Sequence, residues 1–411
     1  MPTVLLMLFL LQSDEELLKD LQAFTQVASA DERTLRAAVD QTLPRVAKVM
    51  HSSVPRRFST KIVSRGEAAR RLKAMLEREY PGDRLARLGA ALKAVHLVEP
   101  GVDLEKEALA LYAANVGGFY DPHDRTLYLL ADQPAVVQQL VIAHELAHAV
   151  QDEQLGLERA TREAMRSEDA QLALMAAIEG NAQAVAAAVI SADSADEDGM
   201  MAALVAESTA VSASLAADSS GASPWLALQL SFPYAAGGEL VHSLATKDDP
   251  AACRLLSRLP SSTAQVLDPA AYRRNETPLR GSIGLSALLG GAERIYETTL
   301  GRANIDLLAR IHGADSVSDG WRGDVLEVVR RGATQSAAWA VAFKEARQAE
   351  AFAAFYAKLV GGKRRSDALA IEEKDGLVSA VILRGNTTVV FDRVPLERWN
   401  ATADAAGRAL R

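Results

Sequence analysis

Residues 144–148, which read His-Glu-Leu-Ala-His, constrain the fold of this 411-residue chain more than any other stretch. They lie in a segment, Ala135 to Gln154, that contains no proline or glycine and whose apolar residues recur at helical spacing, so it predicts one helix. Histidines four positions apart share one helical face, with Cβ atoms roughly 5–6 Å apart. His144 and His148 can therefore bind one metal ion, and zinc favours nitrogen ligands at about 2.0–2.1 Å. Glu145 follows the first histidine directly, in the position of a general base for metal-assisted hydrolysis.

Residues at both ends of the segment support this helix. Asp132 can cap its first turn, and Pro134 suits that turn because a missing N–H costs nothing there. Gly156 is a natural stop for the helix.

The segment before the helix predicts a β-hairpin. Gly118–Tyr120 and Thr126–Leu130 are short β-prone runs, and the residues between them, Asp-Pro-His-Asp at 121–124, are typical of a turn. We expect a strand edge near the helix, with which an extended peptide could pair through backbone hydrogen bonds.

A third ligand is predicted on a later helix. Asp169 to Ile190 is rich in Ala, Leu and Val and carries one acid in its middle, Glu179. An ionisable group in such a stretch is costly to bury without a partner, and a metal ion would be such a partner. Gly180 lowers helix propensity, and the close approach of a neighbouring helix would explain its presence. Two histidines, one glutamate and one water make an open catalytic zinc site.

Other interpretations of these residues stand beside this one. His144 and His148 could form a polar patch on an exposed helix, and Glu179 could be a helix residue paired with an arginine. Asp152 lies four residues beyond His148 on the same face, so it could replace Glu179 as a ligand or support a ligand. The full set of competing third ligands is Asp152, Glu153, Glu163 and Glu168.

The run from His144 to Asp152, with a glutamate on a later helix, resembles the zincin metallopeptidases. It is most similar to the gluzincins, typified by thermolysin, in which the third ligand is glutamate. The resemblance implies that His144, His148 and Glu179 bind zinc and that Glu145 is the base and polariser of the attacking water.

Two departures from known patterns matter. The metzincin pattern needs a glycine and a third histidine where this chain has Gln151 and Gln154, so that pattern does not fit. In thermolysin-like enzymes an aspartate four residues after the ligand glutamate supports a ligand histidine. Gln183 occupies that position here, so the residues around the ligands must differ.

A wider pattern resembles an uncharacterised bacterial family of H-E-x-x-H proteins, for which no substrate is known. The segments that carry this resemblance, besides the H-E-x-x-H run, are Gly118–Pro122, Glu179-Gly180, Phe232–Tyr234, Ser261–Leu267 and Gly320–Asp324.

Gluzincins usually have a further donor, Tyr or His, that stabilises the oxyanion of the transition state. Candidates are Tyr120, Tyr234 and His242, and the last two are eight residues apart. An unbroken helix would put Tyr234 and His242 near one face, but glycines at 237 and 238 predict an interruption. The alternative is that Tyr234 is a core tyrosine with a satisfied hydroxyl and that His242 is a surface histidine.

Composition narrows the class of protein. Hydrophobic residues make up 49% of the chain and aromatic residues 5%, and the abundance of Ala and Leu favours a helical protein. The net charge of −8 argues against nucleic acid as a partner. The single cysteine, Cys253, excludes an internal disulfide. Apart from Ala-rich helices, no apolar run is long enough to predict a membrane span.

The N-terminus gives two interpretations. Val4 to Leu11 is an apolar run of the length of a minimal signal-peptide core, but no Lys or Arg precedes it and acids follow at once. Ala28-Ser29-Ala30 resembles a cleavage site but lies far from the run. The run is either an export signal or the first element of the fold. The resemblance to peptidases that act outside the cytoplasm favours an exported protein, periplasmic or extracellular.

The chain is expected to be α+β and mainly helical, in three parts. Residues 1–112 predict a helical region, residues 113–312 a zincin-like core that holds the hairpin and both ligand helices, and residues 313–411 a small antiparallel α+β unit. Within the core, 224–275 and 281–312 are expected to be helical, and 191–223 reads as an acidic, Ala/Ser-rich loop and helix. The C-terminal part predicts strands at 324–329, 337–343, 378–383 and 387–391, and a helix at 350–359.

Together these features predict a zinc-dependent peptidase that acts on a peptide or protein. Two alternatives remain: a metal-binding or scaffold module without catalysis, and a metal hydrolase with a non-peptide substrate.

Overall fold

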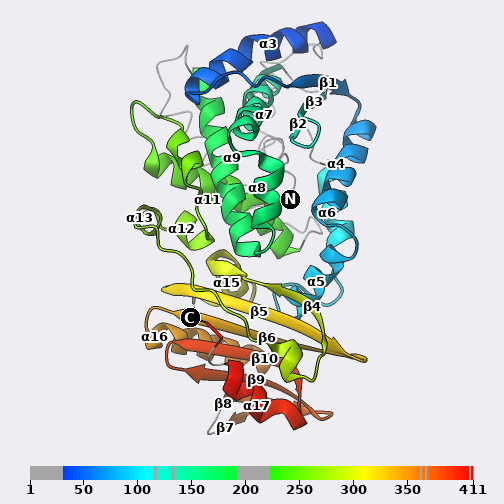
Figure 1. Ribbon diagram of the computed structural model, residues 1–411, viewed down its shortest axis with the longest axis vertical. Coiled ribbons are helices and arrows are strands. Elements are labelled where there is room, and N and C mark those ends of the chain that lie inside the picture. The colour runs from blue at the N-terminus through cyan, green and yellow to red at the C-terminus, as the bar shows by residue number, and fades with distance from the viewer. Residues whose placement is uncertain are drawn as a thin grey trace.

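The computed structural model describes residues 31–114, 118–130, 135–191, 223–361, 363–365, 368–406 and 409–410. A helical part fills the upper half of Figure 1, and a twisted antiparallel sheet lies below it. The α+β class expected from the sequence, with an antiparallel C-terminal sheet, is confirmed. The predicted export signal at 4–11 and 28–30 and the predicted loop and helix at 192–222 lie outside the described residues.

The N-terminal part of the described chain has four helices. These helices are α3 (Glu32–Val49), α4 (Arg65–Glu79), α5 (Arg84–Ala94) and α6 (Leu104–Ala114). Asp31 caps α3 by accepting from the Thr34 N–H, and Ser64 caps α4 by accepting from the Glu67 N–H.

The predicted hairpin is confirmed as β2 (Gly118–Asp121) and β3 (Thr126–Leu130), with Tyr120 opposite Leu127. A third strand, β1 (Ser59–Val63), pairs in parallel with β3, which gives the order β1-β3-β2. The expectation of helices alone before residue 112 is therefore wrong at β1. β1 is short and partly exposed, and it pairs with a strand more than 60 residues away, so no local signal marks it.

The two predicted ligand helices are confirmed as α7 (Ala135–Leu155) and α9 (Glu168–Ser191), joined through α8 (Leu157–Ala164). Gly156 ends α7 in the left-handed conformation, with φ of 65°. The proposed cap residues Asp132 and Pro134 lie outside the described residues.

Helix α11 (Pro224–Leu244) packs against α9 and corrects one expectation. It continues through Gly237 and Gly238, so the predicted interruption is wrong. A Cβ atom on Gly180 would overlap the backbone of Gly237, and a Cβ atom on Gly237 would overlap the Ala176 carbonyl. The glycines therefore permit close helix packing, and the inference that Gly180 marks a close helix approach is confirmed.

Short elements follow α11 and lead to the C-terminal sheet. They are a 3-10 turn (Cys253–Ser257), α12 (Thr263–Leu267), α13 (Pro269–Arg273), α14 (Leu285–Leu288), β4 (Glu293–Thr298) and α15 (Gly301–Ile311). The expectation of a helical pair at 281–312 is wrong at β4, which pairs antiparallel with β5 and so depends on a distant segment.

The C-terminal sheet has seven described strands in the order β4-β5-β6-β10-β9-β8-β7. The predicted strands and helix are confirmed and extended as β5 (Trp321–Arg331), β6 (Thr334–Phe343), α16 (Ala346–Val360), β9 (Leu377–Arg384) and β10 (Thr387–Pro395). The elements that the sequence did not predict are β7 (Lys363–Arg365), β8 (Ala368–Lys374), a 3-10 turn (Leu396–Arg398) and α17 (Trp399–Ala406). Trp339 packs against α16 on one face, and Phe391 packs against Trp399 of α17 on the other.

A buried carboxylate joins the sheet to the helical part. Asp324 on β5 accepts hydrogen bonds from the N–H groups of Leu300 and Gly301 at the start of α15. The indole N–H groups of Trp321 and Trp339 donate to the same carboxylate. Four donors compensate the burial of this acid, so the sheet is anchored to the end of α15. The three-part domain division stays a prediction.

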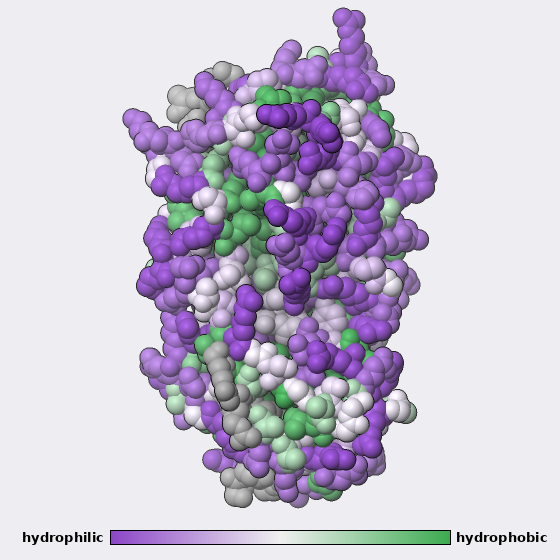
Figure 2. Space-filling view, in the orientation of Figure 1, coloured by the Kyte–Doolittle hydropathy of each residue, from purple (hydrophilic) through white to green (hydrophobic). Residues whose placement is uncertain are grey.

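Helix α9 combines apolar composition with burial. Within the described residues, Glu168–Ile190 is long and apolar enough to cross a membrane, but 94% of its apolar window lies inside the protein. Its side chains are part of the hydrophobic core that also contains side chains of α7 and α11. The face of the molecule in Figure 2 is mainly hydrophilic, with scattered hydrophobic patches.

The close packing of α9 and α11 gives the first prediction. Gly237→Ala places a methyl group against the Ala176 carbonyl, so we expect the free energy of unfolding to fall by about 1–3 kcal/mol in urea denaturation. Gly66→Ala is the matched control, since Gly66 is an exposed position of α4 where a Cβ atom would meet only the Arg70 guanidinium and should raise helix propensity. Equal stability of Gly237→Ala and wild type would contradict the packing constraint.

Candidate metal centre

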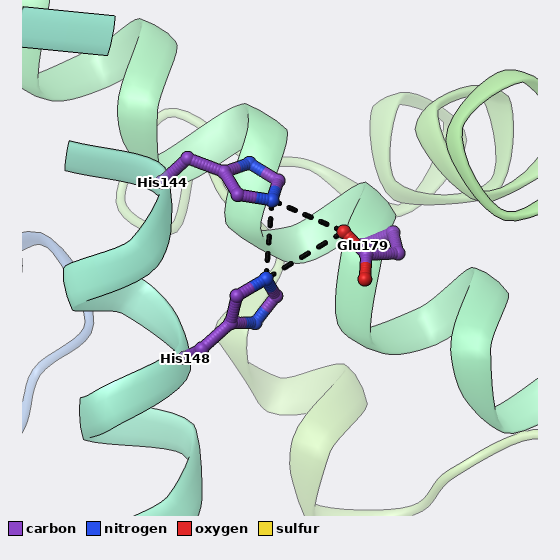
Figure 3. Close-up of side chains that lie close together, drawn as sticks. All are labelled: His144, His148 and Glu179. Carbon is purple, nitrogen blue, oxygen red and sulfur yellow. Dashed lines mark hydrogen bonds and ion pairs between the residues drawn. The ribbon is translucent and has the colours of Figure 1, made fainter. Parts of the chain in front are cut away.

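Two helices bring three side chains together. His144 and His148 lie one turn apart on α7, with ring centroids 4.7 Å apart and ring planes nearly perpendicular. Glu179 points at them from the middle of α9 (Figure 3). Its Oε2 lies 3.1 Å from His144 Nε2 and 3.6 Å from His148 Nε2, and the two Nε2 atoms are 3.1 Å apart. The structure thus brings together the three residues that the sequence predicted as ligands.

These separations suit a small tetrahedral cation. Ligand bonds of about 2.0–2.1 Å at tetrahedral angles require ligand atoms about 3.3–3.4 Å apart. The three observed distances lie on either side of this value. Two imidazole nitrogens and a carboxylate oxygen are also a donor set that zinc accepts.

The polar atoms of the cluster are incompletely satisfied by the protein. His144, His148 and Glu179 are each no more than 2% exposed. Glu179 Oε1 and His144 Nδ1 are buried and have no hydrogen-bond partner in the part of the chain that the structure describes. A buried carboxylate oxygen without a partner is costly, and a cation would compensate it. The residues therefore fit a bound metal ion.

Gln151 is a neighbour of the ligands that the sequence reasoning missed. Its Oε1 lies 2.7 Å from His148 Nδ1, on the side of the ring away from Glu179. Its Nε2 donates to the Ile178 carbonyl and to Asn181 Oδ1, both on α9. The available signal was position: Gln151 lies three residues after His148, on the same face of α7. Gln183, which replaces the aspartate of thermolysin-like enzymes, is buried on α9.

Glu145 is held by the hairpin. Its Oε2 accepts a hydrogen bond of 2.9 Å from the backbone N–H of Tyr120 on β2. Burial, opposed by His148 and by this hydrogen bond, raises the pKa of Glu145 to about 8. A pKa near neutrality is in the range where a carboxyl can both accept and return a proton.

The competing third ligands have other roles or positions. Asp152 accepts from the Tyr120 hydroxyl at 2.9 Å and from the Leu157 N–H at 2.8 Å, and so ties α7 to β2 and α8. Glu168 is buried beside Thr298 and Tyr296, near the C-terminal sheet. Glu153 and Glu163 are exposed. The hydrogen bond to Asp152 also accounts for the hydroxyl of Tyr120, one of the three predicted oxyanion donors.

Of the other two predicted oxyanion donors, Tyr234 lies beside the cluster and His242 does not. The Tyr234 ring on α11 is buried and lies nearly parallel to the His144 imidazole, with ring centroids 6.1 Å apart. His242 is exposed near the C-terminal end of the same helix. Eight residues of helix separate them by about 12 Å along the axis.

The charges of the cluster shift the pKa values of its own groups. Burial raises the pKa of Glu179, but the nearby imidazoles outweigh it and hold the pKa below the usual value. Burial lowers the pKa of His148, but Glu179 and Glu145 outweigh it and raise the pKa to about 9. Burial lowers the pKa of His144. A cation that binds here must displace a proton from His148, so metal affinity should rise with pH.

Two family models match parts of the chain, and one of them covers the cluster. Residues 77–219 match a family model described as "Putative metallopeptidase family (DUF6782)", and residues 272–402 match one described as "Domain of unknown function (DUF8575)". The first match includes both ligand helices and all three side chains of the cluster. No curated protein and no solved structure matches the chain. The chain therefore has a metallopeptidase-like segment with a His/His/Glu cluster that can hold a metal ion.

The cluster leads to a prediction on metal content. Wild-type protein dialysed after exposure to zinc should retain about one ion per chain, as expected for a single site with three protein ligands. His148→Ala should lose it, measured by inductively coupled plasma mass spectrometry. His123→Ala is the control, because His123 is an exposed histidine of the hairpin turn. Retention of zinc by His148→Ala at the control level would place the metal elsewhere.

Proposed function

We propose that this protein is a zinc-dependent peptidase of the gluzincin type, with His144, His148 and Glu179 as ligands and Glu145 as general base. The observation that carries the proposal is the convergence of three ligand atoms, at 3.1–3.6 Å, with a second buried acid, Glu145, on the helix that carries both histidines. The match of residues 77–219 to the metallopeptidase family model supports it.

When bound, zinc would supply a Lewis acid that polarises the scissile carbonyl and lowers the pKa of water. Glu145 would then act on the protons. The Tyr120 N–H occupies Oε2 and orients the carboxylate, so we assign Oε1 as the atom that takes a proton from the attacking water. The same oxygen would return that proton to the leaving amine.

Strand β2 supports a peptide as the substrate. Among the described strands it is, with β1, one of the two outer strands of the order β1-β3-β2. Its four residues are buried, and its Tyr120 N–H points at Glu145. A peptide laid along this edge in an extended conformation would place a backbone carbonyl close to the proposed base. This arrangement favours a peptide over a substrate without a backbone to pair.

Tyr234 is the donor that we propose for the oxyanion, because its buried ring lies beside His144. A hydroxyl that donates to the developing negative charge lowers the barrier without being needed for metal binding. His242 is exposed at the end of α11, and this position gives it no place in the proposed chemistry.

The proposed base can be tested by one substitution. Glu145→Gln keeps the shape of the side chain but cannot take a proton, so cleavage of fluorescently labelled casein should fall by about 100-fold or more. The zinc content should stay at the wild-type value. Glu153→Gln on the exposed side of the same helix is the matched control and should cleave normally. Cleavage by Glu145→Gln at the control rate would exclude this mechanism, and a zinc-loaded wild type that cleaves nothing would favour a scaffold module.

The proposed oxyanion donor is tested separately. Tyr234→Phe removes only the hydroxyl, so kcat should fall by about 100-fold while KM and zinc content change little. Tyr272→Phe is the control, since it removes a tyrosine hydroxyl that donates to the Arg258 carbonyl in another part of the core. An unchanged kcat in Tyr234→Phe would remove this residue from the mechanism.

A further inference from the structure

We infer that Gln151 and Asn181 are positioning residues that keep a proton on Nδ1 of His148 and so leave Nε2 as its metal-binding nitrogen. This inference rests on the proposed function, because it assigns a cause to the ligand geometry. The carrying observation is a chain of hydrogen bonds that begins at a backbone carbonyl and ends at the imidazole.

The direction of the chain follows from its first acceptor. Asn181 Nδ2 lies 2.7 Å from the Ala251 carbonyl oxygen. A carbonyl oxygen only accepts hydrogen bonds, so the amide nitrogen of Asn181 must face Ala251. The amide oxygen of Asn181 then faces Gln151.

Gln151 is oriented by two acceptors at once. Its Nε2 lies 2.9 Å from the Ile178 carbonyl and 2.8 Å from Asn181 Oδ1. Both partners accept, so the nitrogen end of the amide must point at α9 and the oxygen end at His148. Gln151 Oε1 is 2.7 Å from His148 Nδ1, and an amide oxygen cannot donate. Nδ1 of His148 must therefore carry the proton.

The other nitrogen of the ring faces the cluster. His148 Nε2 lies 3.1 Å from His144 Nε2 and 3.6 Å from Glu179 Oε2. With Nδ1 kept protonated, the proton that the ring loses to a cation is the one on Nε2. Gln151 and Asn181 do not ionise, so this assignment holds at every pH at which the fold is intact.

The two ligand histidines are therefore unequal. His144 Nδ1 is buried and has no hydrogen-bond partner within the described residues, so no described group holds a proton on that nitrogen. His144 Nε2 instead lies 3.1 Å from Glu179 Oε2. His148 is oriented before a metal arrives, and Gln151 is the residue that distinguishes it.

The carbonyl that starts the chain is itself held in place. Ala252, which follows it, is fully buried and adopts a left-handed conformation with φ of 47°. The Asp249 carboxylate accepts from the N–H groups of Cys253 and Arg254 and closes the loop around it. A loop about 100 residues after α7 in the sequence thus contributes to the orientation of a ligand on α7.

The proton position can be measured without activity. Long-range proton–nitrogen NMR of protein labelled with nitrogen-15 histidine reports which ring nitrogen bears hydrogen, and the His148 signals are those lost in His148→Ala. We expect a proton on His148 Nδ1 in both the metal-free and the zinc-loaded protein. A wild-type His148 that carries its proton on Nε2 alone would overturn the inference. A failure of the protein to bind zinc would instead overturn the proposed function. It would leave the inference about His148 standing, because the proton position is also measured in the metal-free protein.

A variant tests the consequence for binding. Gln151→Met removes the acceptor and both donors at similar volume, so zinc affinity, measured by competition with a chelator, should fall by about 10–100-fold. Gln154→Met, the same substitution at an exposed position in the last turn of α7, is the control. Zinc affinity of Gln151→Met equal to that of the control would overturn the role of Gln151. If Gln151→Met does not fold, the wild-type spectrum still decides.

Discussion

The burial of the Glu179 carboxylate is the constraint on which the rest of the structure depends. This acid lies in the middle of an apolar helix and is 1% exposed. A charge so placed is tolerable only beside compensating groups, and the two imidazoles of α7 are the groups that meet it. The arrangement of His144, His148 and Glu179 that could hold a metal ion is thus also the arrangement that compensates the burial of the Glu179 charge.

Small residues and neutral amides make this arrangement feasible. Gly180, next to the ligand, and Gly237 on α11 let two helix backbones approach without side chains between them. Gln151 and Asn181 bridge α7 and α9 within hydrogen-bond distance, and they satisfy one another without adding charge to the cluster. The β2 strand completes the site, since Tyr120 holds Glu145 through its N–H and Asp152 through its hydroxyl.

The elements that the sequence predicted were those with local signals. Hydrophobic periodicity predicted the ligand helices, and turn residues predicted the hairpin. The cost of burying a charge in an apolar helix singled out Glu179. Each of these signals acts within one segment of the sequence. The strands β1 and β4 could not, since each is defined by pairing with a distant partner. The sequence places Gln151 on the same helical face as His148. Its hydrogen-bond partners on α9 could not be predicted, because they depend on how the two helices pack. The low helix propensity of Gly237 and Gly238 predicted an interruption of α11. The sequence does not show that α9 packs against Gly237, and this packing explains why that glycine lies within a continuous helix.

The central claim is that three side chains from two helices hold one cation. Diffraction data collected on both sides of the zinc absorption edge, from crystals of the zinc-loaded protein, test it most directly. We expect one anomalous peak bonded to His144 Nε2, His148 Nε2 and a carboxylate oxygen of Glu179, at about 2.0–2.2 Å from each. A zinc peak elsewhere in the molecule, or a Glu179 carboxylate turned away from the two imidazoles, would contradict it.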